Sequence, residues 1–184
     1  MRVVGGKAKG RRLRGTVSPG GRPTTERVRA AIFNIIDPGQ FQGERVLDLY
    51  AGSGSLGIEA LSRGAAWADF VELDRRQCDV IQFNLESTGF GNCAGVRCAD
   101  VSRSLSRLGG PYKLVLLDPP YRLLDLGELL ERVASAPGLI ASGGIAVVGH
   151  SRHMSLSSGY GPLRLTSHRR YGDNVVDFYL RDVD

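Results

Sequence analysis

Residues 48–57 read DLYAGSGSLG, and this stretch decides the fold. It begins inside an apolar run, Val46 to Tyr50, that is typical of a buried strand, and it leads into Leu56 to Arg63, which has the pattern of a helix. The glycines of a G-x-G-x-x-G motif lie between the two, at Gly52, Gly54 and Gly57. A strand, a glycine loop and a helix in this order are typical of a Rossmann-like unit with parallel strands.

The rest of the chain continues this alternation. Further strands are expected at 68–73, 95–98, 112–117 and 144–149, and further helices at 75–87, 101–108 and 125–135. Two final strands, at 163–170 and 175–181, flank residues 171–174, YGDN, which have the composition of a hairpin turn. We therefore predict a doubly wound α/β sheet, mostly parallel, that ends in an antiparallel hairpin.

A second stretch, LVLLDPPY at 114–121, carries chemistry. Its apolar residues predict a strand buried on both faces, and Pro119 and Pro120 stop that strand at Asp118 because proline cannot donate to a ladder. A carboxylate and the ring of Tyr121 are therefore expected at the carboxyl end of a strand, where open α/β sheets bind ligands. Taken alone, the same residues also fit a simple turn.

Another acid is expected at the same edge of the sheet. Glu72 ends the strand after the glycine loop, which is the place for a carboxylate that grips ribose hydroxyls. The fingerprint fits NAD as well as S-adenosylmethionine, but Asp48 and Asp74 would repel a pyrophosphate and attract a sulfonium. We therefore predict S-adenosylmethionine as the cofactor. Asp100, after the third strand, either contacts the adenine amino group or caps the following helix.

A methyl donor beside Asp118 suggests a reaction. An exocyclic amine on a base is a poor nucleophile because its lone pair is delocalised into the ring. If Asp118 and the backbone carbonyl of Pro119 each accept one amine hydrogen, the nitrogen can direct its lone pair at the methyl group. The prolines fix the loop, and Tyr121 can stack on a base turned out of its helix. The predicted catalytic residues are Asp118, Pro119, Pro120 and Tyr121.

Positive charge is concentrated at the N-terminus. The net charge is +5, yet residues 1–30 hold nine basic side chains and one acid, so the remainder is net negative. Glycines and short apolar pieces predict a small hairpin or arm over 1–21, and an apolar helical face over 22–40 joins it to a domain at 22–184. Such a segment points to a nucleic-acid partner, and taken alone it also fits a solvated basic tail. The residues expected to bind it are Lys7, Lys9, Arg11, Arg12, Arg14, Arg22, Arg27 and Arg29.

These motifs together resemble the class I amino-methyltransferases, whose signature is (D/N)PP(Y/F/W). With RVVGGKAKGRRL at 2–13, RPTTERVRAAIFN at 22–34 and DLYAGSGSLGIEALSRGA at 48–65, nearly the whole chain is similar to the bacterial 16S ribosomal RNA guanine-N2 methyltransferase family. The segment at 22–34 is the most specific, since DPPY is shared with DNA amino-methyltransferases. The resemblance implies methylation of one guanine N2 in 16S rRNA. We expect a partly assembled small subunit as the substrate, because so small an enzyme has little surface for selecting one base in naked RNA.

The predicted site residues follow from the glycine loop and from this resemblance, which implies contacts of Asp118 and Pro119 with the target amine and stacking by Tyr121. The expected cofactor-binding residues are Asp48, Ala51, Gly52, Ser53, Gly54, Gly57, Glu72, Leu73, Asp100 and Val101. The sequence departs from the family at residues 148–151, VGHS, a strand end where relatives tend to carry an acid.

Other features argue against further kinds of site. Cys78, Cys93 and Cys98 form no CxxC motif, so neither a disulfide framework nor a zinc site is indicated. His150 and His153 are expected to be surface histidines rather than metal ligands. No apolar run approaches the roughly 18 residues of a membrane span, and the N-terminus lacks the apolar core of a secretory signal. We therefore expect a cytoplasmic protein, a monomer without a metal.

Two other functions stay open on the sequence alone. A DNA adenine-N6 methyltransferase shares the DPPY motif, although a sizeable target-recognition segment is missing. A nucleic-acid-binding module could keep the fold without catalysis, but the intact Asp118 and glycine loop argue against it. An NAD oxidoreductase fits least well.

Overall fold

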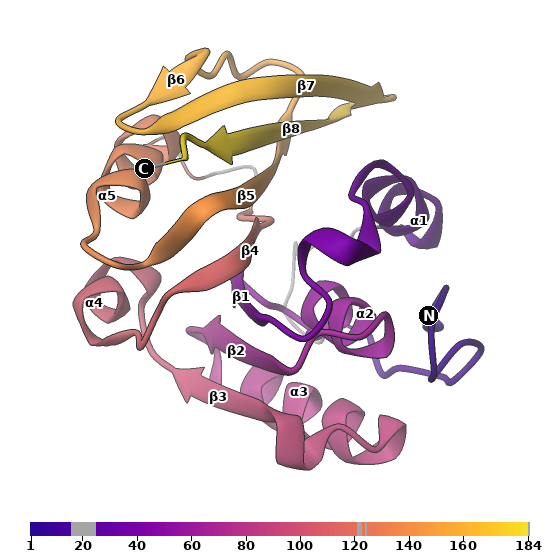
Figure 1. Cartoon of the computed structure of the whole chain (residues 1–184). Coiled ribbons are helices and arrows are strands. Elements are labelled where there is room, and N and C mark those ends of the chain that lie inside the picture. Colours follow the sequence, from indigo (N-terminus) through magenta and orange to yellow (C-terminus); the bar gives the residue numbers. More distant parts are fainter. Residues whose placement is uncertain (16–24, 121–122, 124, 184) are drawn as a thin grey trace.

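The computed structural model describes residues 1–15, 25–120, 123 and 125–183. Its centre is one eight-stranded sheet with the order β3-β2-β1-β4-β5-β8-β7-β6 (Figure 1). The first five strands in this order run parallel, and β8, β7 and β6 are antiparallel additions. The strands are β1 (Arg45–Leu49), β2 (Trp67–Glu72), β3 (Ala94–Cys98), β4 (Tyr112–Leu117), β5 (Ile140–Ser151), β6 (Gly159–Tyr160), β7 (Leu163–Tyr171) and β8 (Asn174–Arg181). The predicted fold class is confirmed.

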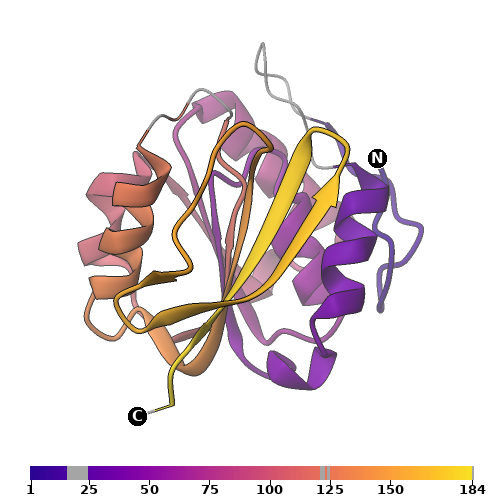
Figure 2. The same cartoon turned by 90° about the horizontal axis from the view of Figure 1, so that it is seen from above.

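Helices cover both faces of the sheet. They are α1 (Glu26–Ile35), α2 (Ser55–Ser62), α3 (Arg75–Thr88), α4 (Val101–Ser104) and α5 (Leu126–Ser135). Figures 1 and 2 show α1, α2 and α3 on one face and α4 and α5 on the other. Two apolar clusters fill the two layers, and β1 contributes to both, with Val46 in one and Leu47 and Leu49 in the other. The central strands are therefore buried on both sides, as their continuous apolar runs predicted.

The strand order brings the predicted motifs to one edge. β1 pairs in parallel with β2 on one side and with β4 on the other, and Leu49 lies level with Leu117. The residues that follow these strands therefore meet at the carboxyl edge of the sheet, where open α/β folds bind ligands. Because β8 is antiparallel to β5, the turn between β7 and β8 also lies at this edge, with Ser151 opposite Asn174.

Helix α1 lies within the segment 22–40 that was predicted to be helical. The side chain of Thr25 accepts a hydrogen bond from the N–H of Val28 and caps the helix. The helix ends at Ile35, and Asp37 caps a separate 3₁₀ turn, Pro38–Gln40. Within the described part of the chain, no helix is both long and apolar enough to span a membrane.

Strand β5 is longer than predicted, and β6 was not predicted. The strand begins at Ile140 instead of the predicted Gly144, and its pairing with β4 has an irregular register. Gly143 has a φ of 63°, and a Cβ on Gly144 would lie 2.7 Å from the carbonyl oxygen of Ala141. These glycines permit an irregular strand to continue through 143–144.

The N-terminal segment is a small hairpin packed on α2. Arg2 and Arg12 form an antiparallel bridge, and Val3, Ala8 and Leu13 are buried in the core on the α1 side of the sheet. The predicted hairpin is thus present in residues 1–15, which we call the arm. It is a docked part of the domain rather than a solvated tail.

Candidate active site at the carboxyl edge of the sheet

The glycine loop requires its glycines. Gly52 and Gly54 have φ values of 55° and 75°, in the left-handed region that glycine adopts at low cost. A Cβ on Gly57 would lie 2.3 Å from the ring of Phe70, so only glycine lets α2 approach β2 this closely. Tyr50, just before the loop, also has a positive φ of 59°, which is uncommon for a residue with a side chain. Backbone strain of this kind often occurs at functional sites, and no motif in the sequence predicted it here.

Asp48 lies beneath the loop instead of on its rim. Its carboxylate is 1% exposed and accepts a hydrogen bond of 2.8 Å from the N–H of Gly57. Burial raises the pKa of Asp48 well above its usual range, the Gly57 hydrogen bond opposes this, and the charges of Asp118 and Glu72 add to it. Asp48 therefore fixes the start of α2 to β1 and shares one negative region with the other two acids.

Glu72 also supports the loop. One carboxylate oxygen accepts from the N–H of Gly52 at 2.8 Å, and the other accepts from the N–H of Asp74 at 2.9 Å. The next side chain, Leu73, is 68% exposed, which is unusual for leucine. An acid that grips the loop and an exposed apolar side chain thus lie together at the end of β2.

Asp100 and Val101, which were predicted to bind the cofactor, follow β3 and both have structural roles. Asp100 accepts a hydrogen bond of 3.0 Å from the N–H of Arg103, so of its two predicted roles the helix cap is observed. Val101 is buried in the core on the α5 side, so its side chain faces away from solvent. Contacts of either residue with a cofactor stay predictions.

Asp118 follows β4 and is half-buried. Gly149 of β5 lies directly beside it, since a Cβ at that position would be 2.5 Å from a carboxylate oxygen of Asp118. Pro119 is buried and Pro120 is exposed. Gly149 belongs to the segment that departs from the family pattern, and its role in making room for Asp118 was not predicted. Tyr121 lies outside the residues that the structure describes.

The loop is tied to the arm through a buried amide. The side chain of Asn84 on α3 donates to the carbonyl of Ser53 at 2.9 Å, accepts from the N–H of Arg14 at 2.8 Å and donates to the carbonyl of Arg14. The Ser53 hydroxyl also donates to the sulfur of Met1 at 3.7 Å. Ala51 pairs with β2 through a hydrogen bond to Val71. No pattern in the sequence predicted this role for Asn84.

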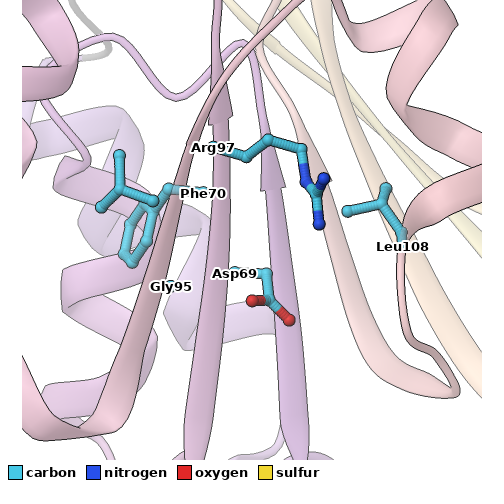
Figure 3. Close-up of a pocket in the computed structure, with 6 residues that line it drawn as sticks. Asp69, Phe70, Gly95, Arg97 and Leu108 are labelled. Carbon is cyan, nitrogen blue, oxygen red and sulfur yellow. The ribbon is translucent and has the colours of Figure 1, made fainter.

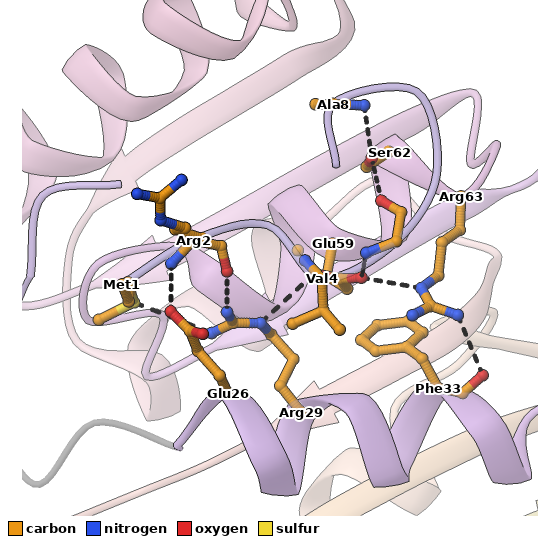
Figure 4. A network of polar contacts seen from close by, with 12 residues as sticks. Met1, Arg2, Val4, Ala8, Glu26, Arg29, Phe33, Glu59, Ser62 and Arg63 are labelled. Carbon is orange, nitrogen blue, oxygen red and sulfur yellow. Dashed lines mark hydrogen bonds and ion pairs between the residues drawn. The ribbon is translucent and has the colours of Figure 1, made fainter. Parts of the chain in front are cut away.

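The structure corrects the prediction made for Arg29. The predicted RNA contact is wrong for this residue, because its side chain is fully buried and its Nε lies 3.4 Å from a Glu59 carboxylate oxygen (Figure 4). Its guanidinium also donates to the carbonyl of Arg2. Burial lowers the pKa of Arg29, while Glu59 and Glu26 oppose this. Helical spacing could have indicated that Arg29 is buried, because it lies three residues before the buried Ile32.

Glu59 is the centre of this network. It is fully buried, accepts from the N–H groups of Val4 and Gly5 at 2.8 and 2.7 Å, and pairs with Arg63 at 2.9 Å in addition to Arg29. Two guanidinium groups and two backbone N–H groups thus converge on one carboxylate, and these contacts dock the arm on α2 (Figure 4). The remaining basic side chains of the prediction that the structure describes are exposed, and they are Lys7, Lys9, Arg11, Arg12, Arg14 and Arg27. Arg22 lies outside the described residues.

His150 is a second correction. It was expected at the surface, but it is 4% exposed, and its Nε2 lies 3.0 Å from a carboxylate oxygen of the buried Asp177. The other oxygen of Asp177 lies 2.6 Å from Nδ1 of His168. His153 is exposed, as expected. Among the residues with described positions, no three His, Cys, Asp or Glu side chains gather as a metal site.

A pocket on β2 and β3 belongs to another part of the sheet. Its lining includes Asp69, Phe70, Arg97 and Leu108 (Figure 3). Asp69 is already engaged there, because it accepts from the guanidinium of Arg45 and from the hydroxyl of Tyr112 at 2.8 and 2.7 Å. The pocket shares no residue with the glycine loop or the Asp118 segment.

Known proteins place the chain in a family. A family model described as "Conserved hypothetical protein 95" matches residues 1–180. The chain belongs to this family. The Bacillus subtilis protein named "Putative rRNA methyltransferase YlbH" is 37% identical over 184 residues, covering 98% of this chain and 99% of that protein. "Ribosomal RNA small subunit methyltransferase D" of Escherichia coli is 43% identical over 122 residues, covering 66% of this chain and 61% of that protein. The resemblance inferred from the motifs is confirmed.

Solved structures share the architecture of this Conserved hypothetical protein 95 member. "Putative methyltransferase yhhF from Escherichia coli" is 32% identical with a TM-score of 0.84, and the match covers 100% of this chain and 99% of that one. A more distant RNA methyltransferase from Salinibacter ruber, solved in complex with S-adenosyl-L-homocysteine, is 15% identical with a TM-score of 0.67, covering 89% and 95% of the two chains. The distant similarity supports the fold alone.

In this member of the family, the structure brings most of the predicted site together. The glycine loop, Glu72, Leu73 and Asp118 meet at the carboxyl edge, with Asp48 beneath them. It separates Arg29 from the other basic residues. It adds three residues that were missed: Tyr50, Asn84 and Gly149.

Proposed function

We propose that this protein transfers a methyl group from S-adenosylmethionine to the exocyclic N2 amine of a guanine in 16S ribosomal RNA. The observation that carries the proposal is the placement of the glycine loop and Asp118 after adjacent parallel strands, β1 and β4. The relatives named as ribosomal RNA methyltransferases support the reaction class, and the small-subunit relative supports 16S RNA as the substrate.

The residues at this edge fit S-adenosylmethionine, which supplies a methyl group on a positively charged sulfur. Asp48, Glu72 and Asp118 form one negative region, in which the last two raise the pKa of Asp48 beyond the effect of burial. Such a region favours a cation and disfavours a pyrophosphate. Leu73 offers an exposed apolar surface for an adenine face, and the Glu72 carboxylate is in the place that suits ribose hydroxyls.

Asp118 and Pro119 orient the target amine in this proposal. The Asp118 carboxylate and the Pro119 carbonyl each accept one amine hydrogen, which turns the nitrogen lone pair toward the methyl group. Gly149 supports this arrangement because it leaves room for the Asp118 side chain. Pro120 stiffens the segment, and Tyr121 stacks on the base. The protein forms no covalent intermediate with the RNA.

The arm contributes RNA binding. Its exposed lysines and arginines meet backbone phosphates. The proposed domains are 1–21 as the RNA-binding segment and 22–184 as the catalytic domain, in which 22–40 is the joining segment. A partly assembled small subunit in the cytoplasm is the proposed substrate, and the enzyme acts as a monomer.

The test is transfer of labelled methyl groups to 16S RNA, offered both naked and within partly assembled small subunits, followed by mapping of the modified nucleotide. We expect Asp118→Ala to lower kcat by about a hundredfold or more, because orienting groups contribute on this scale. Its affinity for S-adenosylmethionine, measured by calorimetry, should stay close to that of the wild type. Asp79→Ala on α3, whose side chain is 63% exposed, is the control and should be fully active.

Two outcomes contradict the proposal. Near-normal activity of Asp118→Ala would show that the amine is oriented by other groups. Label in duplex DNA, with none in ribosomal RNA or subunits, would favour the adenine-N6 methyltransferase instead.

A further inference from the structure

The C-terminal hairpin carries positive charge that the fold does not neutralise. Residues 151–171 contain four arginines and no acid. Two of these arginines pair with carboxylates, Arg152 with Asp173 and Arg164 with Asp182. For Arg169 and Arg170 the described residues provide no ion pair, and their guanidinium groups donate to backbone carbonyls at 3.2 and 3.0 Å. Both side chains are exposed, so their charge is available to a partner.

The strand register places Arg169 in line with Asp118. Leu117 of β4 lies level with Val148, so the next residue, Asp118, lies beside Gly149 of β5. Gly149 is opposite Val176 of β8, and Val176 is opposite Arg169 of β7. Residues opposite one another in antiparallel strands share a face of the sheet. Arg169 and Asp118 thus lie in one row on one face, three strand spacings apart, or about 14 Å.

Arg170 lies on the other face. Successive residues of a strand point to opposite faces, and His168, two residues earlier, shares its face with Arg170. His168 is held there by Asp177, which His150 also binds from β5. The contacts of the buried Asp177 with the two histidines fix the orientation of the hairpin. Arg169 then lies on the same face of the sheet as Asp118, and Arg170 lies on the other face.

The site itself repels RNA. The cluster of carboxylates at the carboxyl edge, which favours a cationic cofactor, disfavours the phosphates on either side of a target base. The arm and Arg169 lie on the same face of the sheet, because Val176, the partner of Arg169, belongs to the same apolar cluster as Val3 of the arm. The arm packs on α2, whereas the hairpin extends the sheet beyond β5. Figure 2 shows the turn between β7 and β8, in yellow, on the same side of the molecule as the start of α1. Cations on the arm and on the hairpin offset the repulsion at the centre.

We propose that Arg169 binds the phosphate backbone of the substrate RNA beside the target nucleotide, on the β7–β8 side of the site. This inference rests on the proposed function, because it concerns the RNA substrate of the same site. The guanidinium donates to phosphate oxygens and adds affinity without selecting a base.

Binding of a 16S RNA transcript over a series of salt concentrations tests this contact. Loss of one phosphate contact is expected to weaken binding about fivefold to tenfold at low salt and to lower the salt-dependence slope by about 0.7 to 1. Arg169→Gln should show both changes, Arg169→Lys should retain most of the binding, and Arg170→Gln should stay close to the wild type. S-adenosylmethionine affinity and the thermal unfolding midpoint should be unchanged in all three.

Equal losses in Arg169→Gln and Arg170→Gln would attribute the effect to overall charge and overturn the proposal, as would wild-type binding by Arg169→Gln. The outcome is separable from that of methyl transfer. If the wild type bound the transcript in an Arg169-dependent way but methylated no ribosomal RNA, the proposed reaction would fail and the RNA-binding surface would stand.

Discussion

Glu59 on α2 and Asp48 on β1 are both buried carboxylates next to the glycine loop, but their surroundings differ. Glu59 faces two guanidinium groups and accepts from the N–H groups of Val4 and Gly5. Asp48 accepts from the N–H of Gly57, and the charges nearest to it are those of other carboxylates. Buried charge is neutralised where it holds the arm in place, and it is left uncompensated where we propose that a cation binds.

The arginines show the same contrast. Arg29 lies in the most basic part of the sequence, yet it is buried and paired with Glu59. Arg169 lies outside the basic N-terminal segment, yet it is exposed and has no carboxylate partner among the residues with described positions. Compensation by neighbours, and not the density of charge along the chain, separates structural charges from those available to a ligand.

The largest effect is expected when the compensated charge is removed. Glu59→Gln leaves the Arg29 guanidinium buried without its counter-charge, and removing one partner of such a pair costs about 3–5 kcal/mol. Denaturant unfolding monitored by circular dichroism measures the loss. Glu86→Gln, an exposed change on α3, is the control and should stay within about 0.5 kcal/mol of the wild type. Similar stability of the two variants would mean that Glu59 does not hold the arm.

An intermediate effect is expected at Asp177, whose partners are imidazoles instead of guanidinium groups. Asp177→Asn keeps one acceptor oxygen but loses a hydrogen bond between a carboxylate and a histidine, which contributes about 1.5–3 kcal/mol when a charged group takes part. Urea unfolding at neutral pH measures the change. Asp173→Asn, in the exposed turn of the same hairpin, should lose at most about 1 kcal/mol. If both variants lost the same amount, the buried contact would have no special part in fixing the hairpin.

The smallest effect is expected at the uncompensated charge, and it has the opposite sign. Because burial raises the pKa of Asp48 above that of an unfolded aspartate, the unfolded chain releases this proton first, and stability falls as the pH rises through the folded pKa. Asp48→Asn removes this loss and can still accept from Gly57. The variant should therefore gain stability relative to the wild type above about pH 4, the unfolded pKa, with no difference below it.

Unfolding curves at pH 3 and pH 8 test this sign. Calorimetry should also show weaker binding of S-adenosylmethionine to the Asp48→Asn variant, since a negative charge near the cation is lost. Lower stability than the wild type at pH 8 would contradict the assignment of Asp48 as an uncompensated buried acid.

Local sequence was sufficient for most of the fold and for the backbone of the site. Strand β4 could be predicted because a continuous apolar run ends in two prolines. The glycine loop could be predicted because the spacing of its glycines is strict. The capping role of Asp100 was one of two open alternatives and is observed, while its contact with a cofactor stays a prediction. These features depend on residues close together in the chain.

The features that the sequence did not predict depend on contacts between residues far apart in the chain. His150 is buried because Asp177, 27 positions later, meets it across β5 and β8. Asn84 joins Ser53 to Arg14 through contacts 31 and 70 positions apart. Arg29 is the exception, because its place beside Ile32 on the inner face of α1 could have been read from helical spacing. The high density of basic residues in this part of the chain favoured a predicted RNA contact instead.

Gly149 also limits how this site can change in evolution. Any side chain at 149 would place a Cβ 2.5 Å from the Asp118 carboxylate, so the two positions are not independent. A side chain at 149 therefore requires the Asp118 carboxylate to turn away from its present position. The direction in which that carboxylate points is thus set in part by a residue on the neighbouring strand, 31 positions later in the chain.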